Sequence, residues 1–199
     1  MDIEHVAKRT RDEQDVLASR MKRYEQEAAT AKYIDFKLPV LCRIDGHKFS
    51  TFTRGFEKPF DPRIHEAMVE TTKDLTEYFL ANTGYTFSDE ITLIFAPIEE
   101  HQEPPYNGKV LKLCTLLSSY ACVRFAYHMQ SCINAETEPA IRKLLENPKM
   151  SFDARLWNVP TKDEALANIR WRSLFDCRRN GIGLLARKYY KPKQLHKVR

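Results

Sequence analysis

The chain has 199 residues, of which 43% are hydrophobic and 30% are charged, a composition typical of a globular protein with one full core. It contains no run of eighteen apolar residues and no apolar signal segment at its start, so we expect a cytoplasmic protein with no membrane partner. The five cysteines are odd in number and lack CxxC spacing, and the six histidines are scattered. This pattern suggests neither a disulfide framework nor a zinc site, so we expect oxygen ligands for any metal.

Charge is distributed unevenly along the chain. Residues 170–199 hold ten Lys and Arg against one acid, Asp176, a local charge of +9, and because the whole chain carries +5, residues 1–169 carry −4. Such a basic segment is attracted to polyphosphate, for which RNA is the natural candidate. The alternative is an ordinary solvated helix face.

The first predicted element is a helix from Glu4 to Lys32, in a stretch that is rich in Ala, Glu, Lys and Arg and free of Gly and Pro. Its apolar stripe is thin, which indicates an outer arm or a contact with another subunit. We therefore divide the chain into an N-terminal helical arm, residues 1–36, and a main domain, residues 37–199, that ends in the basic segment, for which we expect a helix.

A buried strand that ends in a carboxylate follows the arm. Residues 40–45 alternate as a strand does and place Asp45 at the last position. Gly46 can adopt backbone angles closed to other residues, so the amides after it could curve into a cup for an anion. These amides belong to His47, Lys48, Phe49 and Ser50. A carboxylate beside such a cup suits Mg²⁺ bound to a triphosphate, although Asp-Gly alone is most often only a turn.

The next helix is predicted from its start signals. Asp61 and Pro62 read as an N-cap followed by a first-turn proline, and the apolar pattern continues to about Ala81. We therefore favour a capping role for Asp61 over a ligand role.

Residues 85–95 predict a hairpin with two adjacent carboxylates, Asp89 and Glu90, at its bend. Strands disfavour Asp, and packing gives no reason for both acids. In an extended segment the two side chains would point to opposite faces, so we expect Asp89 to dominate. Glu90 then either orients a water or a neighbouring donor, or has a structural role.

The second half of the chain predicts a surface loop over 97–107, helices over 109–128, 139–146 and 161–175, and a strand over 151–158. Lys109 and Lys112 lie near the start of the first of these helices, where they face either phosphates or solvent. Thr161 and Glu164 form a capping box at the start of the last.

The predicted order is strand, helix, strand, strand, helix, strand, helix, which is an α+β fold of the split βαβ type with helices on one face of an antiparallel sheet. This topology brings Asp45 next to the hairpin that carries Asp89. Two neighbouring carboxylates repel unless a cation lies between them, so a bound divalent metal is expected. Two ions roughly 3.5 to 4 Å apart would suit transfer of a phosphoryl or nucleotidyl group.

Several blocks occur together in one order along the chain: residues 43–49 (RIDGHKF), 56–63 (FEKPFDPR), 88–90 (SDE), 152–155 (FDAR) and 158–160 (NVP). In these blocks the chain resembles the tRNA-histidine guanylyltransferase superfamily, reverse polymerases that add nucleotides to RNA 5′ ends. The resemblance covers most of residues 38–190. It implies a palm-like fold shared with ordinary polymerases and nucleotide cyclases.

The resemblance also implies the site. Its motif suggests Asp45, the carbonyl of Gly46, and Asp89 as ligands of two Mg²⁺ ions, with Asp45, Asp89 and Glu90 as the catalytic acids. The nucleotide-binding candidates are Asp45, Gly46, His47, Lys48, Phe49, Ser50, Lys58, Ser88, Asp89 and Lys112. The implied chemistry has two stages, in which ATP first adenylylates an RNA 5′-monophosphate and the 3′-hydroxyl of a nucleoside triphosphate, usually GTP, then displaces AMP.

The subtype is indicated by a departure from the family pattern. Eukaryotic members that guanylate tRNA-histidine carry a His-Ile-Asn block after an Asp-Cys pair, whereas residues 176–180 here read DCRRN. This favours the Thg-like branch, in which template-directed repair of 5′-truncated tRNA is typical. The RNA-binding candidates are Arg178, Arg179, Asn180, Arg187 and Lys188. Family members usually continue into a further C-terminal segment, so we expect either that the given sequence is incomplete or that this member is short.

Other interpretations remain open. Guanosine addition at position −1 of tRNA-histidine is the main alternative. A nucleotide cyclase would share the two acids but would use no RNA, and a palm domain without activity would only bind RNA. The family suggests a homotetramer built from dimers.

Overall fold

The structure, a computed structural model, describes residues 3–28, 31–134, 137–190 and 194. Its helices are α1 (Ile3–Ala28), α2 (Phe49–Phe52), α3 (Pro62–Tyr78), α4 (Val110–Ser131), α5 (Pro139–Glu146), α6 (Lys162–Trp171) and α7 (Cys177–Tyr189). Its strands are β1 (Val40–His47), β2 (Thr83–Phe87), β3 (Glu90–Phe95) and β4 (Ser151–Asn158). Short 3₁₀ turns, η1 (Thr53–Gly55) and η2 (Pro105–Gly108), lie between them, and a π-helical segment, η3 (Arg172–Asp176), joins α6 to α7.

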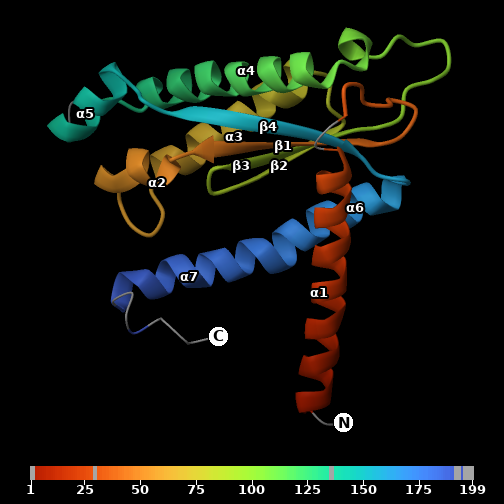
Figure 1. Ribbon diagram of the computed structural model, residues 1–199. Coiled ribbons are helices and arrows are strands. Elements are labelled where there is room, and N and C mark those ends of the chain that lie inside the picture. The colour runs from red at the N-terminus through yellow and green to blue at the C-terminus, as the bar shows by residue number, and fades with distance from the viewer. Residues whose placement is uncertain (1–2, 29–30, 135–136, 191–193, 195–199) are drawn as a thin grey trace.

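The four strands form one antiparallel sheet in the order β2-β3-β1-β4 (Figure 1). This confirms the predicted α+β fold and its split βαβ topology. Strand β1 is central, and its register places Asp45 opposite Glu90 of β3 on one side and Asp153 of β4 on the other. The functional acids predicted from sequence therefore lie at one end of the two central strands.

One face of the sheet packs on α3 and α4 and forms the main core. Apolar residues of α4 recur every four positions and turn inward, from Leu113 through Leu117 and Ala121 to Phe125 and Met129. By length and composition alone α4 could cross a membrane, but this stripe is buried against the sheet.

The opposite face is also partly covered, so the prediction of helices on one face only is wrong. Leu41, Ile94 and Trp157 point to this side and pack with Ala165 of α6. Figure 1 shows α6 and α7 running beneath the sheet, with α1 projecting away from it. Because successive strand residues alternate between faces, this second layer meets the face that carries Asp45.

The C-terminal half of α1 is packed into the same unit. Met21 is 1% exposed, and the guanidinium of Arg20 donates to the carboxylate of Glu164 on α6 at 3.0 Å. Glu25 accepts hydrogen bonds from Arg43 of β1 (2.6 Å) and Arg155 of β4 (2.9 Å). Helix α1 therefore contacts the main domain of its own chain through its last turns.

Helix starts follow the predicted caps. The side chain of Asp61 accepts a hydrogen bond from the amide of Arg63 (3.0 Å), which confirms its capping role. Thr161 accepts from the amide of Glu164 (3.2 Å), while the Glu164 carboxylate binds Arg20 instead of completing the capping box. Helix α3 ends at Tyr78, earlier than predicted.

Candidate functional site

The end of β1 and the β2–β3 hairpin are tied together at the predicted acids. The amide of Gly46 donates a hydrogen bond to the carbonyl oxygen of Asp89 at 3.0 Å. A Cβ added at Gly46 would lie 3.0 Å from the Cβ of Asp89 and 2.7 Å from Cδ2 of Phe49. Glycine is therefore needed here because the turn carrying Asp89 approaches the strand so closely. The expected adjacency of Asp45 and the acidic hairpin is confirmed.

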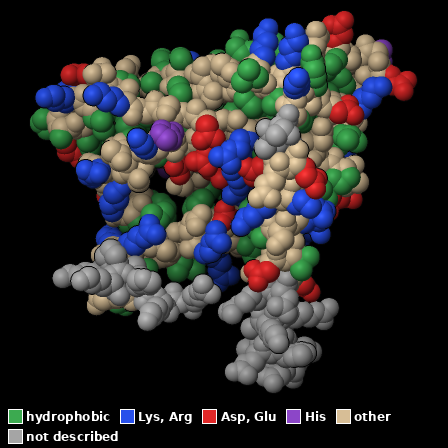
Figure 2. Space-filling view, viewed as in Figure 1, with side chains coloured by type: hydrophobic (Ala, Val, Ile, Leu, Met, Phe, Trp, Pro, Cys, Tyr) green, Lys and Arg blue, Asp and Glu red, His purple; other side chains and the backbone are tan. Residues whose placement is uncertain are grey.

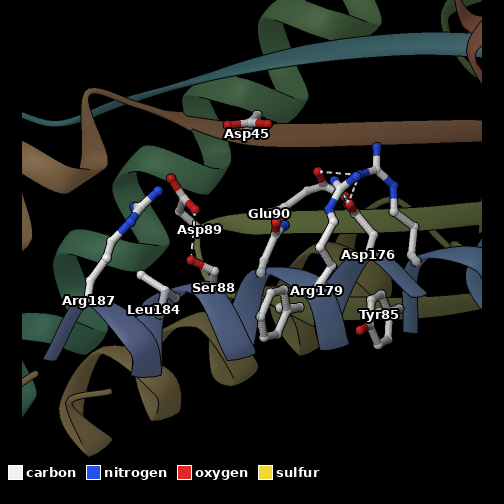
Figure 3. A pocket seen from close by; sticks show the side chains of 13 residues that line it. Asp45, Tyr85, Ser88, Asp89, Glu90, Asp176, Arg179, Leu184 and Arg187 are labelled. Atoms are coloured by element: carbon white, nitrogen blue, oxygen red, sulfur yellow. Dashed lines mark hydrogen bonds and ion pairs between the residues drawn. The ribbon is translucent and has the colours of Figure 1, made fainter. Parts of the chain in front are cut away.

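A cavity of about 500 Å³ opens between this end of the sheet and α7 (Figure 3). Both Asp89 and Glu90 line it together with Asp45, so the expectation that the two hairpin acids point to opposite faces is wrong. The reason is local: Asp89 lies in the turn after Ser88, whose φ is +56°, and only Glu90 belongs to the strand. Figure 2 shows acidic side chains gathered in this hollow with Lys and Arg side chains around them.

The electrostatics of Asp45 suit a bound cation. Burial raises the pKa of Asp45, and the negative charge of Asp89 raises it further, against the opposing effect of Arg43. Among the residues that the structure describes, nothing donates a hydrogen bond to the Asp45 carboxylate, whereas Asp89 accepts one from Ser88 at 2.9 Å. Two adjacent carboxylates with so few protein partners are stabilised when a divalent cation neutralises them.

The donor set is the one that Mg²⁺ takes when it binds together with a phosphorylated ligand. Within the described ranges, no group of three or more His, Cys, Asp or Glu side chains is placed to hold a metal. A cation at Asp45 and Asp89 would therefore complete its shell with backbone carbonyl, water and substrate oxygens. These residues fit Mg²⁺ and do not resemble a closed structural metal site.

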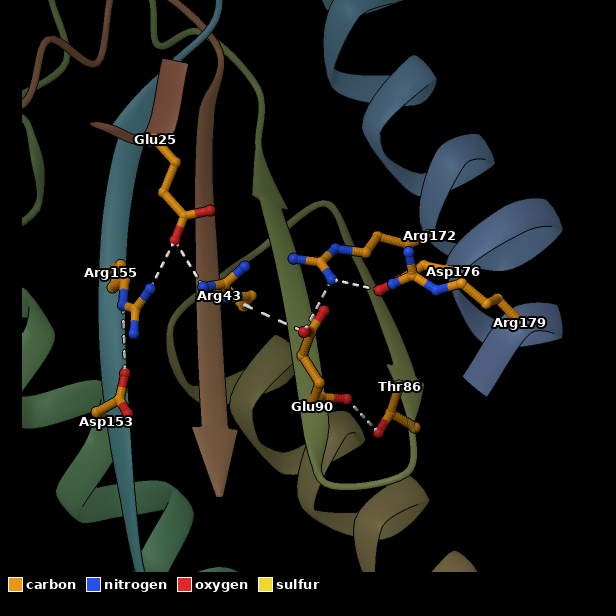
Figure 4. A network of polar contacts seen from close by, with 9 residues as sticks. All are labelled: Glu25, Arg43, Thr86, Glu90, Asp153, Arg155, Arg172, Asp176 and Arg179. Atoms are coloured by element: carbon orange, nitrogen blue, oxygen red, sulfur yellow. Dashed lines mark hydrogen bonds and ion pairs between the residues drawn. The ribbon is translucent and has the colours of Figure 1, made fainter. Parts of the chain in front are cut away.

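Glu90 is engaged elsewhere. Its carboxylate lies 3.1 Å from Nη1 of Arg172, and Arg172 also binds Asp176 at 2.7 Å (Figure 4). Arg172 is only 9% exposed at its side chain, and its guanidinium lies 4.6 Å from the Trp171 ring centroid. Burial raises the pKa of Glu90 to about 7, while Arg172 and Arg43 oppose this shift. Glu90 thus holds the π-helical segment against the sheet.

The same network continues on both sides of Glu90. On α7, Arg179 binds the second oxygen of Asp176. Toward α1, Arg43 lies 4.0 Å from Glu90 and binds Glu25, which also binds Arg155. No pattern in the sequence indicated that α1 reaches the neighbourhood of the site through Glu25. The spacing of Arg172 and Asp176 on one helical face is the one local signal that could have indicated their pair.

The predicted anion cup takes a helical form. Lys48 adopts a left-handed conformation (φ 53°), and the chain then turns into the four-residue helix α2. The ring of Phe49 packs against Phe125 and Phe152, with ring centroids 5.3 and 6.0 Å away. Phe49 is therefore mostly buried in the core, whereas Ser50 is exposed.

A second cavity, of about 590 Å³, lies on the other side of the Ser88–Asp89 turn. Phe49, Phe60, Ile64 and Phe87 give it an apolar lining. Lys58 lines it too, with its ammonium donating to the carbonyl of Thr53 at 2.7 Å. The Ser88–Asp89 turn thus separates an acidic cavity from an apolar one.

The residues predicted to bind RNA or phosphate divide into those that line a cavity and those that do not. Arg179, Asn180 and Arg187 line the acidic cavity, and Arg187 also lines the apolar one together with Lys188. Lys112 and Arg178 line neither cavity. Lys112 belongs to the helix layer on the far face of the sheet, where its ammonium lies 5.2 Å from the centroid of the Tyr106 ring.

The sheet, its helices and the acidic end of β1 together define a palm-like α+β domain. The chain belongs to the tRNAHis guanylyltransferase family, whose family model matches residues 18–160. A bacterial tRNA(His) guanylyltransferase (Thg1)-like protein is similar in structure. In its complex with ATP it has a TM-score of 0.68 and 29% identity, over 89% of this chain and 72% of the bacterial one. In its complex with GTP the TM-score is again 0.68, with 29% identity over 88% and 77% of the two chains.

Two further comparisons bear on the fold and on length. The tRNA(His) guanylyltransferase of Saccharomyces cerevisiae shares the fold, with a TM-score of 0.59 and 23% identity over 76% of this chain and 63% of the yeast one. An uncharacterised protein of Acanthamoeba polyphaga mimivirus is 40% identical over an alignment of 195 positions, which covers 90% of this chain. The match spans 65% of the viral protein.

Proposed function

We propose that the chain is a nucleotidyltransferase that extends the 5′ end of tRNA in the 3′-to-5′ direction and so repairs 5′-truncated tRNA. The observation that carries this proposal is two adjacent carboxylates, Asp45 and Asp89, that have no cationic partner among the described residues and lie in a cavity whose opposite wall carries arginines. Membership of the family supports it, and so do the solved complexes of a bacterial relative with ATP and with GTP.

The reaction in this proposal has two stages. A phosphate oxygen of the RNA 5′-monophosphate attacks the α-phosphorus of ATP, and pyrophosphate leaves. The 3′-hydroxyl of an incoming nucleoside triphosphate then attacks the activated RNA 5′-phosphorus, loses its proton, and displaces AMP. No covalent bond to the protein is formed, so the chain contributes positioning and charge stabilisation.

The residues of the chain have separate roles in this scheme. Asp45, Asp89 and the carbonyl of Gly46 would hold Mg²⁺, which when bound supplies charge neutralisation for the phosphates and the leaving group. Ser88 fixes the Asp89 carboxylate through its hydrogen bond. Lys58 lines the adjacent cavity, where its ammonium would contact a phosphate.

The test is a 5′-extension assay. The protein is incubated with Mg²⁺, ATP, labelled GTP and a tRNA that lacks its first nucleotide, with the opposing template base varied. Wild type is expected to add only the matching nucleotide, and Asp45→Ala and Asp89→Ala are expected to add none. Addition of guanosine to full-length tRNA-histidine without template control would instead establish the guanylyltransferase subtype. Consumption of nucleotide without RNA would refute both.

A further inference from the structure

Three arginines of η3 and α7 line the acidic cavity, and their charges are not equally available. Arg172 is paired with Glu90 (3.1 Å) and Asp176 (2.7 Å), and Arg179 is paired with Asp176. Arg187 has no carboxylate partner among the residues that the structure describes. Since carboxylates neutralise the first two guanidinium groups, Arg187 is the arginine of this cavity that, within the described part of the chain, is free to meet an anion.

The position of Arg187 on α7 directs it to the site. Arg179, Gly183 and Arg187 follow one another at four-residue spacing and therefore share one face of the helix, the face that lines the acidic cavity. A Cβ added at Gly183 would meet nothing within 4 Å, so the space beside Arg187 is open. In Figure 3 the Arg187 side chain lies beside Asp89, away from the Arg179–Asp176 pair.

Arg187 also lies where the two cavities meet. It lines both of them, as do Ser88, Asp89 and Leu184. A ligand that reached from the apolar cavity to the unpaired carboxylates would pass this guanidinium. The charges of the cavity therefore suit a metal-bound anion, with the cation at Asp45 and Asp89 and the anion between that cation and Arg187.

We propose that Arg187 is a phosphate-binding residue that contacts the polyphosphate of a nucleoside triphosphate held at Asp45 and Asp89. This inference rests on the proposed function and deepens it. From the sequence, Arg187 was a candidate for binding RNA, and here it is assigned to binding the nucleotide instead. A guanidinium forms two parallel hydrogen bonds to phosphate oxygens, so the contact is specific in geometry as well as charge.

The test is a calorimetric titration that measures the affinity of the wild-type chain and of three variants for MgATP. Arg187→Gln is expected to weaken MgATP binding by about 10-fold or more, because a charge-assisted contact is lost. Arg187→Lys is expected to recover part of the affinity, since it keeps the charge but not the paired hydrogen bonds. Arg178→Gln is the matched control, because Arg178 lies on the same helix but lines neither cavity. It is expected to bind MgATP as wild type does.

Two further arms identify the source of the phosphate. Adenosine should bind Arg187→Gln and wild type equally, because it carries no phosphate. A tRNA with a 5′-monophosphate should lose no more affinity through Arg187→Gln than through Arg178→Gln. A loss confined to tRNA, or unchanged MgATP binding by Arg187→Gln, would overturn the assignment of Arg187. Failure of the wild-type chain itself to bind MgATP would instead overturn the proposed function, and the assignment with it.

Discussion

Replacement of Gly46 by alanine tests the packing that joins β1 to the acidic turn. The added methyl group would lie 2.7 Å from Cδ2 of Phe49 and 3.0 Å from Cβ of Asp89, which is 0.7 and 0.4 Å short of the 3.4 Å at which ordinary contact begins. Phe49 cannot swing aside, because the residue is only 5% exposed and its ring packs against those of Phe52 and Phe125. The turn carrying Asp89 must therefore move.

The expected cost has two parts. Overpacking of this kind typically lowers the free energy of unfolding by about 1–3 kcal/mol. Displacement of a ligand by roughly 1 Å typically costs about 100-fold in rate, so 5′ extension should fall by one to two orders of magnitude. Urea denaturation, with an unchanged m value, measures the loss of free energy of unfolding, and the extension assay measures the loss of rate.

The matched controls are Gly55→Ala and Gly181→Ala, because a Cβ at either position meets nothing within 4 Å. Both should leave 5′ extension unchanged, and Gly181→Ala should stabilise α7 by up to about 1 kcal/mol. If Gly46→Ala were as stable and as active as these controls, the close approach of Asp89 to β1 would be refuted.

Three further substitutions test the fold. Asp61→Ala should destabilise the chain by about 1–3 kcal/mol in urea denaturation, because the carboxylate caps α3 and binds Arg63 while its side chain is 1% exposed; an unchanged midpoint would contradict this. Burial by itself would raise the pKa of Asp74, but hydrogen bonds from Arg124 and His128 outweigh it and lower the pKa. The stabilisation that the Asp74 carboxylate contributes is therefore present above the unfolded pKa of about 3.9 and is lost as the pH falls through the lower folded pKa. The melting temperature of Asp74→Asn should lie below that of wild type at pH 7 and approach it near pH 3. A difference that stayed constant with pH would contradict this dependence on the ionisation of Asp74. Leu117→Ala, at a fully buried position, should cost about 2–5 kcal/mol in urea, and a cost under 1 kcal/mol would contradict the packing of α4.

Local signals in the sequence were sufficient for the elements and for the central pair of acids. The alternation of residues 40–45 and the capping residue Asp61 each depend on neighbours a few positions away, so they could be predicted without the fold. The adjacency of Asp45 and Asp89 followed from topology alone, because the hairpin pairs with the central strand.

The rest depended on contacts between distant segments. The pairing of Glu90 with Arg172 and the reach of Glu25 to Arg43 join segments that no periodicity connects. The orientation of Asp89 was mispredicted because the residue lies in a turn, where the alternation of a strand no longer applies. Likewise, the ion pairs were needed to see which arginine of the acidic cavity has no carboxylate partner among the described residues.

The account depends most on the sharing of a cation by Asp45 and Asp89. Titration of Mn²⁺, as a probe for Mg²⁺, in the presence of ATP and followed by electron paramagnetic resonance, measures this directly. Asp45→Asn and Asp89→Asn should each weaken binding by about 10-fold or more, because each removes a charged oxygen ligand. Asp163→Asn, which alters an exposed carboxylate in the first turn of α6 that lines neither cavity, should bind Mn²⁺ as wild type does. Wild-type affinity in either of the first two variants would contradict the account.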